Sequence, residues 1–138
     1  MKNRTPLILM ELVVMLLVFA IGAALCLRAF SWADNVSREE AARDHAYLQI
    51  QNAAELLRSN RGDFAAAAEI LGGQWDGKIW SIYWDDGWNM IHQPGAYTLR
   101  AKPVESGAAY LGGATLEILR PDGECLVSLN ICWQEVAP

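Results

Sequence analysis

An apolar run, Leu7–Leu27, constrains the fold of this chain more than any other feature of its sequence. At a rise of about 1.5 Å per residue, a helix over this run is about 30 Å long, which matches the hydrocarbon core of a membrane. Thr5 and Pro6 suit the N-cap and the first position of such a helix. The run therefore predicts a helix over residues 7–29 that crosses a membrane once.

Residues 1–6 form a short basic leader before the run. Lys2, Arg4 and the α-amino group precede the apolar residues, so the positive-inside rule keeps the N-terminus in the cytoplasm and exports the rest of the chain. A cleaved secretory signal is a second interpretation, because Ser31-Trp32-Ala33 offers small residues at the spacing that a signal peptidase needs. The apolar region of such signals is usually shorter, about 7–15 residues, and the length of this run favours a permanent anchor.

Glu11 is the one charged residue inside the run, and it lies near the cytoplasmic end. A charge at the centre of a bilayer costs about 2.5–3.5 kcal/mol on insertion scales. In one interpretation the side chain snorkels or is protonated, close to the positive end of the helix dipole. In the other, it meets a cationic partner when chains assemble. The residues alone do not decide between the two.

A second helical segment follows the run, because no glycine or proline occurs between Phe30 and Asn60. Apolar residues recur there at helical spacing, and Tyr47 and Ala54 flank the stripe that they form. The stripe consists of Ala42, Ala46, Ile50, Ala53 and Leu57. These features predict an exported amphipathic helix over residues 30–61 that continues the first helix. The two helices either form one continuous helix or are separated by a break near Asp34–Asn35. Gly62 is expected to end the helix.

The sequence of residues 62–138 predicts a short helix followed by an antiparallel sheet. Asp63 suits the N-cap of a helix over Phe64–Leu71. Alternating and β-branched segments bounded by turn residues then predict strands. These segments are Lys78–Trp84, Trp88–His92, Tyr97–Lys102, Ala114–Leu119 and Glu124–Gln134. Pro103 marks an edge position or the end of its strand. We therefore expect an α+β fold in which the long N-terminal helix, membrane-spanning in its first half, packs on a small antiparallel sheet of four to five strands.

Six tryptophans are many for a chain of this length, and three of them share a predicted hairpin. Trp80 and Trp84 have the same strand parity, so they face one side of the sheet, and Trp88 follows the turn. One interpretation places these residues in the core against the helix. The alternative is an exposed aromatic platform for a partner subunit or a glycan.

Charge and residue spacing argue against several function classes. The formal net charge of −5 disfavours a nucleic-acid partner. The three cysteines have no metal-ligand spacing, and the odd offset between Cys125 and Cys132 predicts opposite faces of one strand. Asp85 and Asp86 suit turn chemistry. Because no catalytic constellation is present in the sequence, we expect neither an enzyme nor a bound metal or cofactor.

The sequence LILMELVV at residues 7–14, after a short basic leader, resembles the N-terminus of type IV pilins and type II secretion pseudopilins. Mature chains of that family begin with an aromatic or apolar residue, carry glutamate at the fifth position and continue as an apolar helix. Glu11 is the fifth residue counted from Leu7. A long helix that leaves the membrane and a small β domain also agree with the family in outline.

The resemblance implies that a prepilin peptidase cuts the leader between Pro6 and Leu7, where the family has glycine and usually phenylalanine. The new N-terminal residue is then methylated, and Glu11 neutralises the new amine of a neighbouring subunit. If the leader stays on the chain, Lys2 or Arg4 of a neighbouring chain is the expected partner of Glu11.

The resemblance thus predicts a structural subunit of a type IV pilus or type II secretion-type assembly. Its expected partners are membrane lipid, other pilin-like subunits that pack through the apolar helix, and the prepilin peptidase. The expected location is the bacterial cytoplasmic membrane, with a cytoplasmic N-terminus and an extracellular C-terminal domain. The alternative is a single-pass binding module that contacts a protein or the cell wall and does not form filaments.

Overall fold

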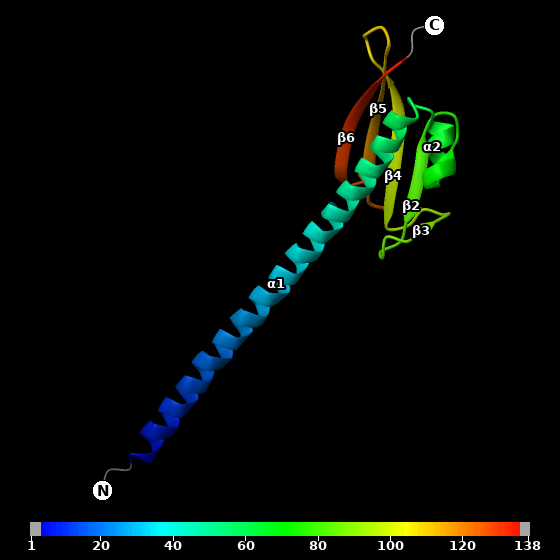
Figure 1. The fold of residues 1–138 in the computed structure, drawn as a ribbon. Helices are drawn as coiled ribbons and strands as arrows, with labels where there is room; N and C mark the ends of the chain where they lie inside the picture. The colour runs from blue at the N-terminus through cyan, green and yellow to red at the C-terminus, as the bar shows by residue number, and fades with distance from the viewer. Residues whose placement is uncertain (1–3, 136–138) are drawn as a thin grey trace. The chain divides into compact units, whose positions relative to one another are not determined.

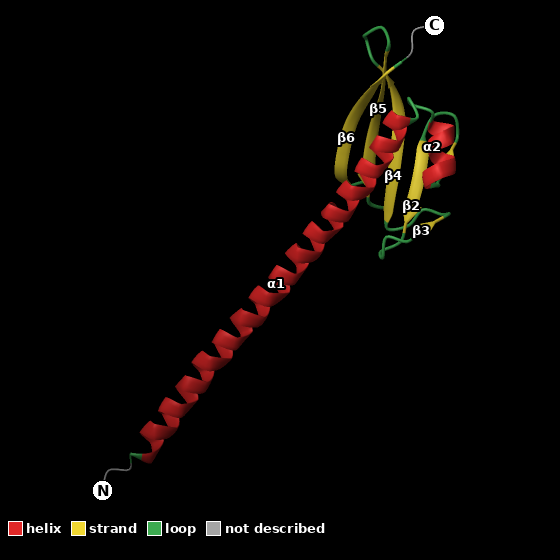
Figure 2. Ribbon diagram, viewed as in Figure 1, coloured by secondary structure: helices red, strands yellow, loops and turns green. Residues whose placement is uncertain are grey.

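The computed structural model describes residues 4–135, which divide into one compact unit up to Ala41 and a second from Ala42 onward. Helix α1, Thr5–Ser59, runs through both units (Figures 1 and 2). It has no break near Asp34–Asn35, where Arg38 Nε lies 3.0 Å from Asp34 Oδ2 one turn earlier. The two predicted helical segments are therefore a single helix.

The apolar stripe of α1 packs in the second unit as its spacing predicts. Ala46, Ile50, Ala53 and Leu57 are fully buried, and Ala54 is almost so. The helix ends at Ser59, two residues before the predicted end at residue 61. Gly62 adopts a positive φ of 78°, as expected after a helix end, and its amide donates to the carbonyl of Leu57 at 2.8 Å. The small alanine side chains on this face allow the helix to approach its neighbours closely.

Helix α2, Phe64–Leu71, has the predicted bounds. The carboxylate of Asp63 accepts a hydrogen bond from the amide of Ala66 at 3.0 Å, which satisfies one of the free donors at the helix start. Phe64 and Ala67 are the buried residues of this short helix, and they form the side that packs on the core. Gly72 follows it with a positive φ of 93° and ends the helix.

Six antiparallel strands form one sheet, one more than the upper end of the predicted number. The strands are β1 Gln74–Trp75, β2 Trp80–Trp84, β3 Met90–Ile91, β4 Tyr97–Glu105, β5 Leu111–Leu119 and β6 Cys125–Gln134. Their order is β1-β2-β4-β5-β6, and β3 pairs with β2 beside β1. The α+β prediction, a long helix packed on a small antiparallel sheet, is confirmed.

The position of β3 differs from a simple meander. In a meander each strand pairs with the strand before it, so β4 would pair with β3. Instead, β4 pairs directly with β2, with Ile82 opposite Leu99, and β3 is a two-residue strand on the other edge of β2. Both ladders coexist because they use opposite edges of β2, and the β2–β4 ladder is the longer one, with five residue pairs against two.

Pro103 lies inside β4 rather than at its end, opposite Ala114 of β5. The β2–β4 ladder stops at the pair Trp80–Ala101, so β4 has one neighbour instead of two at the proline. A residue without an amide proton is tolerated at such an edge position. The predicted edge is therefore correct, and the predicted end of the strand is wrong.

The prediction for Cys125 and Cys132 is also wrong. The register of β5 and β6 shifts between Ile118 and Leu119, because Ile118 pairs with Val127 and Leu119 with Cys125. This bulge reverses the parity, so both cysteines belong to the outer face of the sheet, away from the helices. They remain about 20 Å apart along the strand, at about 3.3 Å per residue, and both are free.

Candidate functional site

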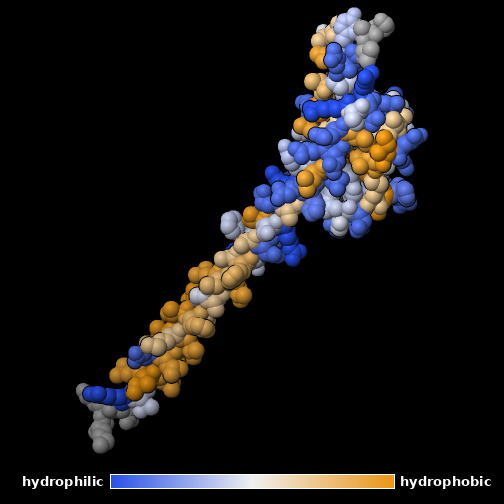
Figure 3. Space-filling view, in the orientation of Figure 1, coloured by the Kyte–Doolittle hydropathy of each residue, from blue (hydrophilic) through white to orange (hydrophobic). Residues whose placement is uncertain are grey.

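The apolar segment of α1 is exposed throughout the first unit. Its large apolar side chains are between 49% and 75% exposed from Leu7 to Leu27. Figure 3 shows this part of the chain as a nearly continuous hydrophobic surface. Among the described residues, α1 is the one helix long and apolar enough to cross a membrane. Such a surface is stable in lipid and unfavourable in water, so the segment is compatible with a membrane anchor.

Glu11 interrupts this surface. Its side chain is exposed and has no hydrogen-bond or ion-pair partner within residues 4–135. Arg4 lies about two turns earlier on the chain, next to the helix start, and Lys2 falls outside the described residues. Within residues 4–135, no side chain thus competes with a further partner for this carboxylate.

The Pro6–Leu7 junction lies in the first turn of α1. The helix begins at Thr5, one residue earlier than predicted, and the amide of Ile8 donates to the carbonyl of Arg4 at 3.2 Å. Pro6 is accommodated because an amide in the first turn has no acceptor within the helix.

Two of the three hairpin tryptophans are core residues. Trp80 is fully buried, and its Nε1 donates to the carbonyl of Gly72 at 3.0 Å, so its one polar group is satisfied. Trp84 is only 3% exposed. Core packing is the correct interpretation for both residues, and an exposed aromatic platform that includes them is wrong. Burial of side chains of this size contributes about 2–3 kcal/mol each.

Trp88 is half-buried and packs at the margin of the same core, with its ring centroid 5.7 Å from that of Trp84. Its ring stacks on Tyr97 with centroids 4.1 Å apart and on His45 of α1 at 5.7 Å. Its φ of 61° is unusual for a residue other than glycine, and the preceding turn holds it there. The Asp85 carboxylate accepts hydrogen bonds from the backbone and side chain of Asn89 and from the Gly87 amide, and these bonds lower the pKa of Asp85.

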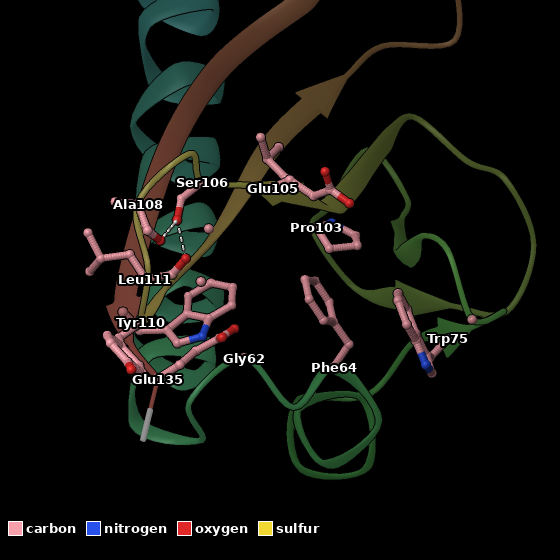
Figure 4. Close-up of a pocket in the computed structure, with 15 residues that line it drawn as sticks. Gly62, Phe64, Trp75, Pro103, Glu105, Ser106, Ala108, Tyr110, Leu111 and Glu135 are labelled. Carbon is pink, nitrogen blue, oxygen red and sulfur yellow. Dashed lines mark hydrogen bonds between the residues drawn. The ribbon is translucent and has the colours of Figure 1, made fainter. Parts of the chain in front are cut away.

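A cleft of about 720 Å³ lies at the other end of the sheet (Figure 4). Four aromatic residues line it, namely Phe64, Trp75, Tyr110 and Trp133. Phe64 and Trp75 stack with centroids 4.7 Å apart, and Figure 4 shows them below Pro103. The exposed Glu105 and Glu135 supply the acidic side chains of the lining. The cleft is thus an open hollow whose lining combines aromatic rings with carboxylates.

Sequence reasoning missed this cleft. Trp133 packs against Gly62 and Gly112, which have no side chains to displace it. Its Nε1 is buried and has no hydrogen-bond partner in the described residues, although Glu135 Oε1 lies on the same side of Gly112. The signal for this cleft is that Trp133 in β6 lies directly opposite Gly112 in β5. This pairing can be recognised only when the register between the two strands is known.

No group of three or more His, Cys, Asp or Glu residues within residues 4–135 is placed to hold a metal ion. Comparisons of the chain with protein-family models, with curated proteins and with solved structures found no match. The structure therefore offers three surfaces as candidates for binding. They are the exposed apolar helix with one carboxylate, the aromatic cleft, and the edge of the sheet formed by its terminal strand β6.

Proposed function

We propose that this protein is a membrane-anchored structural subunit that packs through the apolar part of α1 into a pilin-like or pseudopilin-like assembly. The observation that carries the proposal is that every residue of this apolar segment is exposed, together with its single carboxylate. Lipid covers an apolar helix without a partner, but it does not satisfy a charge. A partner helix satisfies both the apolar surface and Glu11.

Glu11 sets the docking position in this account. A carboxylate without a partner inside a membrane is costly, so the subunit is most stable where a cation of a neighbour meets Glu11. After cleavage at the Pro6–Leu7 junction the cation is the new α-amino group. If the leader remains, Arg4 or Lys2 of a neighbour takes this role. The basic leader favours a cytoplasmic N-terminus and an exported C-terminal domain at a bacterial cytoplasmic membrane.

The intact mass of the protein from native membranes separates the two forms. A chain that begins at Leu7, with or without a methyl group, supports processing by a prepilin peptidase. A full-length chain means that Pro6 blocks the cut and that Arg4 or Lys2 is the partner. A chain that begins at Asp34 contradicts the proposal, because the anchor is then removed and a secreted domain remains.

The size of the complex extracted in mild detergent tests the assembly itself. We expect the wild-type protein to migrate as a multimer and the Glu11→Ala variant to migrate mainly as a monomer that still inserts in the membrane. Glu40→Ala, an exposed position on the same helix outside the apolar run, is the matched control and should assemble normally. If Glu11→Ala assembles like the wild type, Glu11 has no docking role.

The aromatic cleft favours a second candidate function, a single-pass binding module for a protein or cell-wall ligand. Trp75 and Tyr110 present aromatic surface there, as binding sites commonly do. In this account Glu11→Ala has no effect, whereas Trp75→Ala abolishes ligand binding. The two substitutions together therefore distinguish the two functions.

A further inference from the structure

The outer edge of β6 is open along the whole strand. In the sheet order β6 is the terminal strand, and β5 is its one neighbour. Within residues 4–135, no strand or loop forms backbone hydrogen bonds with the outer edge of Cys125–Gln134. Along this ten-residue strand, the amide and carbonyl groups of alternate residues therefore face outward without a backbone partner. Such an edge is a template for another strand.

The opposite edge of the same sheet is protected. Two short strands, β1 and β3, lie along β2 and leave little of its backbone free. Edge strands also commonly carry lysine, proline or an inward-pointing charge that prevents pairing. Cys125–Gln134 contains neither proline nor any charged residue, and its bulge is confined to its first residues. The contrast between the two edges indicates that β6 is kept able to pair.

The apolar layer under the sheet also continues to this edge. On β5, Leu116 and Ile118 are fully buried on the side of the helices. Their neighbours on β6, Leu129 and Val127, are only half-buried. One more strand with apolar residues at alternate positions would cover them and extend the core.

We propose that β6 is a docking site for an extended, uncharged segment of another protein, which adds a seventh strand to the sheet. Backbone hydrogen bonds supply the pairing, and the alternate apolar side chains of the segment pack beside Val127 and Leu129. The segment is uncharged where it meets Val127 and Leu129, because a charge buried beside these apolar side chains would lose its hydration without gaining a partner.

A second copy of this chain fits the edge less well. Antiparallel pairing of β6 with β6 of another copy places residues 42–59 of the two helices in opposite directions. The chains that lead to the two apolar segments then leave at opposite ends, which conflicts with a shared membrane. This step rests on the anchor proposed above. The other edge of a copy is occupied by β1 and β3, so it offers no long strand to β6.

Site-specific photocrosslinking in native cells tests the proposal on the full chain. A photoreactive phenylalanine derivative replaces Ser128 in one variant and Asn130 in another, because both are exposed on the outer face of β6. Residues opposite each other on paired strands lie about 5 Å apart, within reach of the probe. The same substitution at Tyr83 on β2, also on the outer face, is the control.

We expect the two β6 probes to label one uncharged segment of another protein at sites two residues apart, and the Tyr83 probe not to label that segment. Scattered labelling, labelling of β6 in a second copy, or labelling no stronger than at Tyr83 overturns the proposal. None of these results depends on Glu11, so they leave the assembly through α1 to be judged by its own test.

Lysines at the edge provide a second test. With the probe in place of Cys132, the double substitution Ser128→Lys and Asn130→Lys should lower the labelling of the partner segment about tenfold. Thr98→Lys, which adds a charge to the same face on β4, should leave the labelling unchanged. Equal labelling in the double variant and in the wild type contradicts strand addition.

Discussion

Gly62 ends α1 in a left-handed conformation and leaves room for the indole of Trp133. A Cβ at this position would overlap the Trp133 ring, so Gly62→Ala carries both a backbone and a packing cost. Gly77 has a similar φ of 90° but no atom within 4 Å of an added Cβ. Gly77→Ala therefore isolates the backbone cost, about 1–2 kcal/mol.

We expect Gly62→Ala to lower the free energy of unfolding by about 1–3 kcal/mol more than Gly77→Ala does, because the added methyl overpacks the cleft wall. Denaturant unfolding of the two variants in detergent, followed by tryptophan fluorescence, measures the difference. Equal losses would show that Trp133 moves aside freely and that the cleft is not a fixed structure.

Asp85 gives the loop before Trp88 a pH-dependent stability. Its pKa lies below the ordinary value of 3.8 because Asn89 and Gly87 donate hydrogen bonds to the carboxylate. A group with a lowered pKa stabilises the folded state fully above its ordinary value, and this contribution is lost as the pH falls through the lowered value. The stabilisation by Asp85 is therefore present at neutral pH and disappears in acid.

The expected result is that Asp85→Ala is less stable than the wild type at about pH 7 and that the gap narrows at about pH 3. Denaturant unfolding at the two pH values measures it. The neighbouring Asp86→Ala is the control, since the Asp86 side chain has no hydrogen-bond partner among residues 4–135. A gap for Asp85→Ala that does not change with pH would contradict this role.

At the scale of elements, the stripe on α1 attaches the helix to the sheet. Leu57 is fully buried, so Leu57→Ala should lower the free energy of unfolding by about 2–5 kcal/mol. Leu48, on the same helix, is 57% exposed, and Leu48→Ala should have little effect. Denaturant unfolding of both variants provides the comparison. Similar losses would show that this helix does not form part of the core of the second unit.

Local signals explain which elements could be predicted from the sequence. The stripe of α1 and the Asp63 cap of α2 depend on residues close together in the chain, and both were predicted. The direct pairing of β2 with β4 could not be predicted, because it depends on which edge of β2 the intervening strand β3 occupies.

The candidate sites also differ in whether they depend on local sequence or on the pairing of distant strands. Glu11 stands out in the sequence because its neighbours are uniformly apolar. The bulge that places Cys125 and Cys132 on one face, and the cleft around Trp133, arise from the register between distant strands. Burial of Trp80 and Trp84 was one of two interpretations, and strand parity alone did not tell which face the helix covers.

At the scale of the whole molecule, an apolar segment suited to lipid is joined to a separate folded unit that carries the aromatic cleft and the open edge of β6. In the function proposed above, chains pack side by side through the apolar segment and Glu11 directs the packing. Cys26 offers a native reporter, because at about 100° per residue it lies about 60° around the helix from Glu11. Ala24 lies on nearly the opposite side.

The most direct measurement is cysteine crosslinking in native membranes, in a background with Cys125→Ser and Cys132→Ser so that Cys26 is the one thiol left in the sequence. The account predicts efficient dimers through Cys26 and few when the thiol is moved by Cys26→Ala with Ala24→Cys. Glu11→Gln, which removes the charge and keeps the shape, should reduce the Cys26 dimers strongly. Equal crosslinking from both positions, unchanged by Glu11→Gln, would contradict the claim.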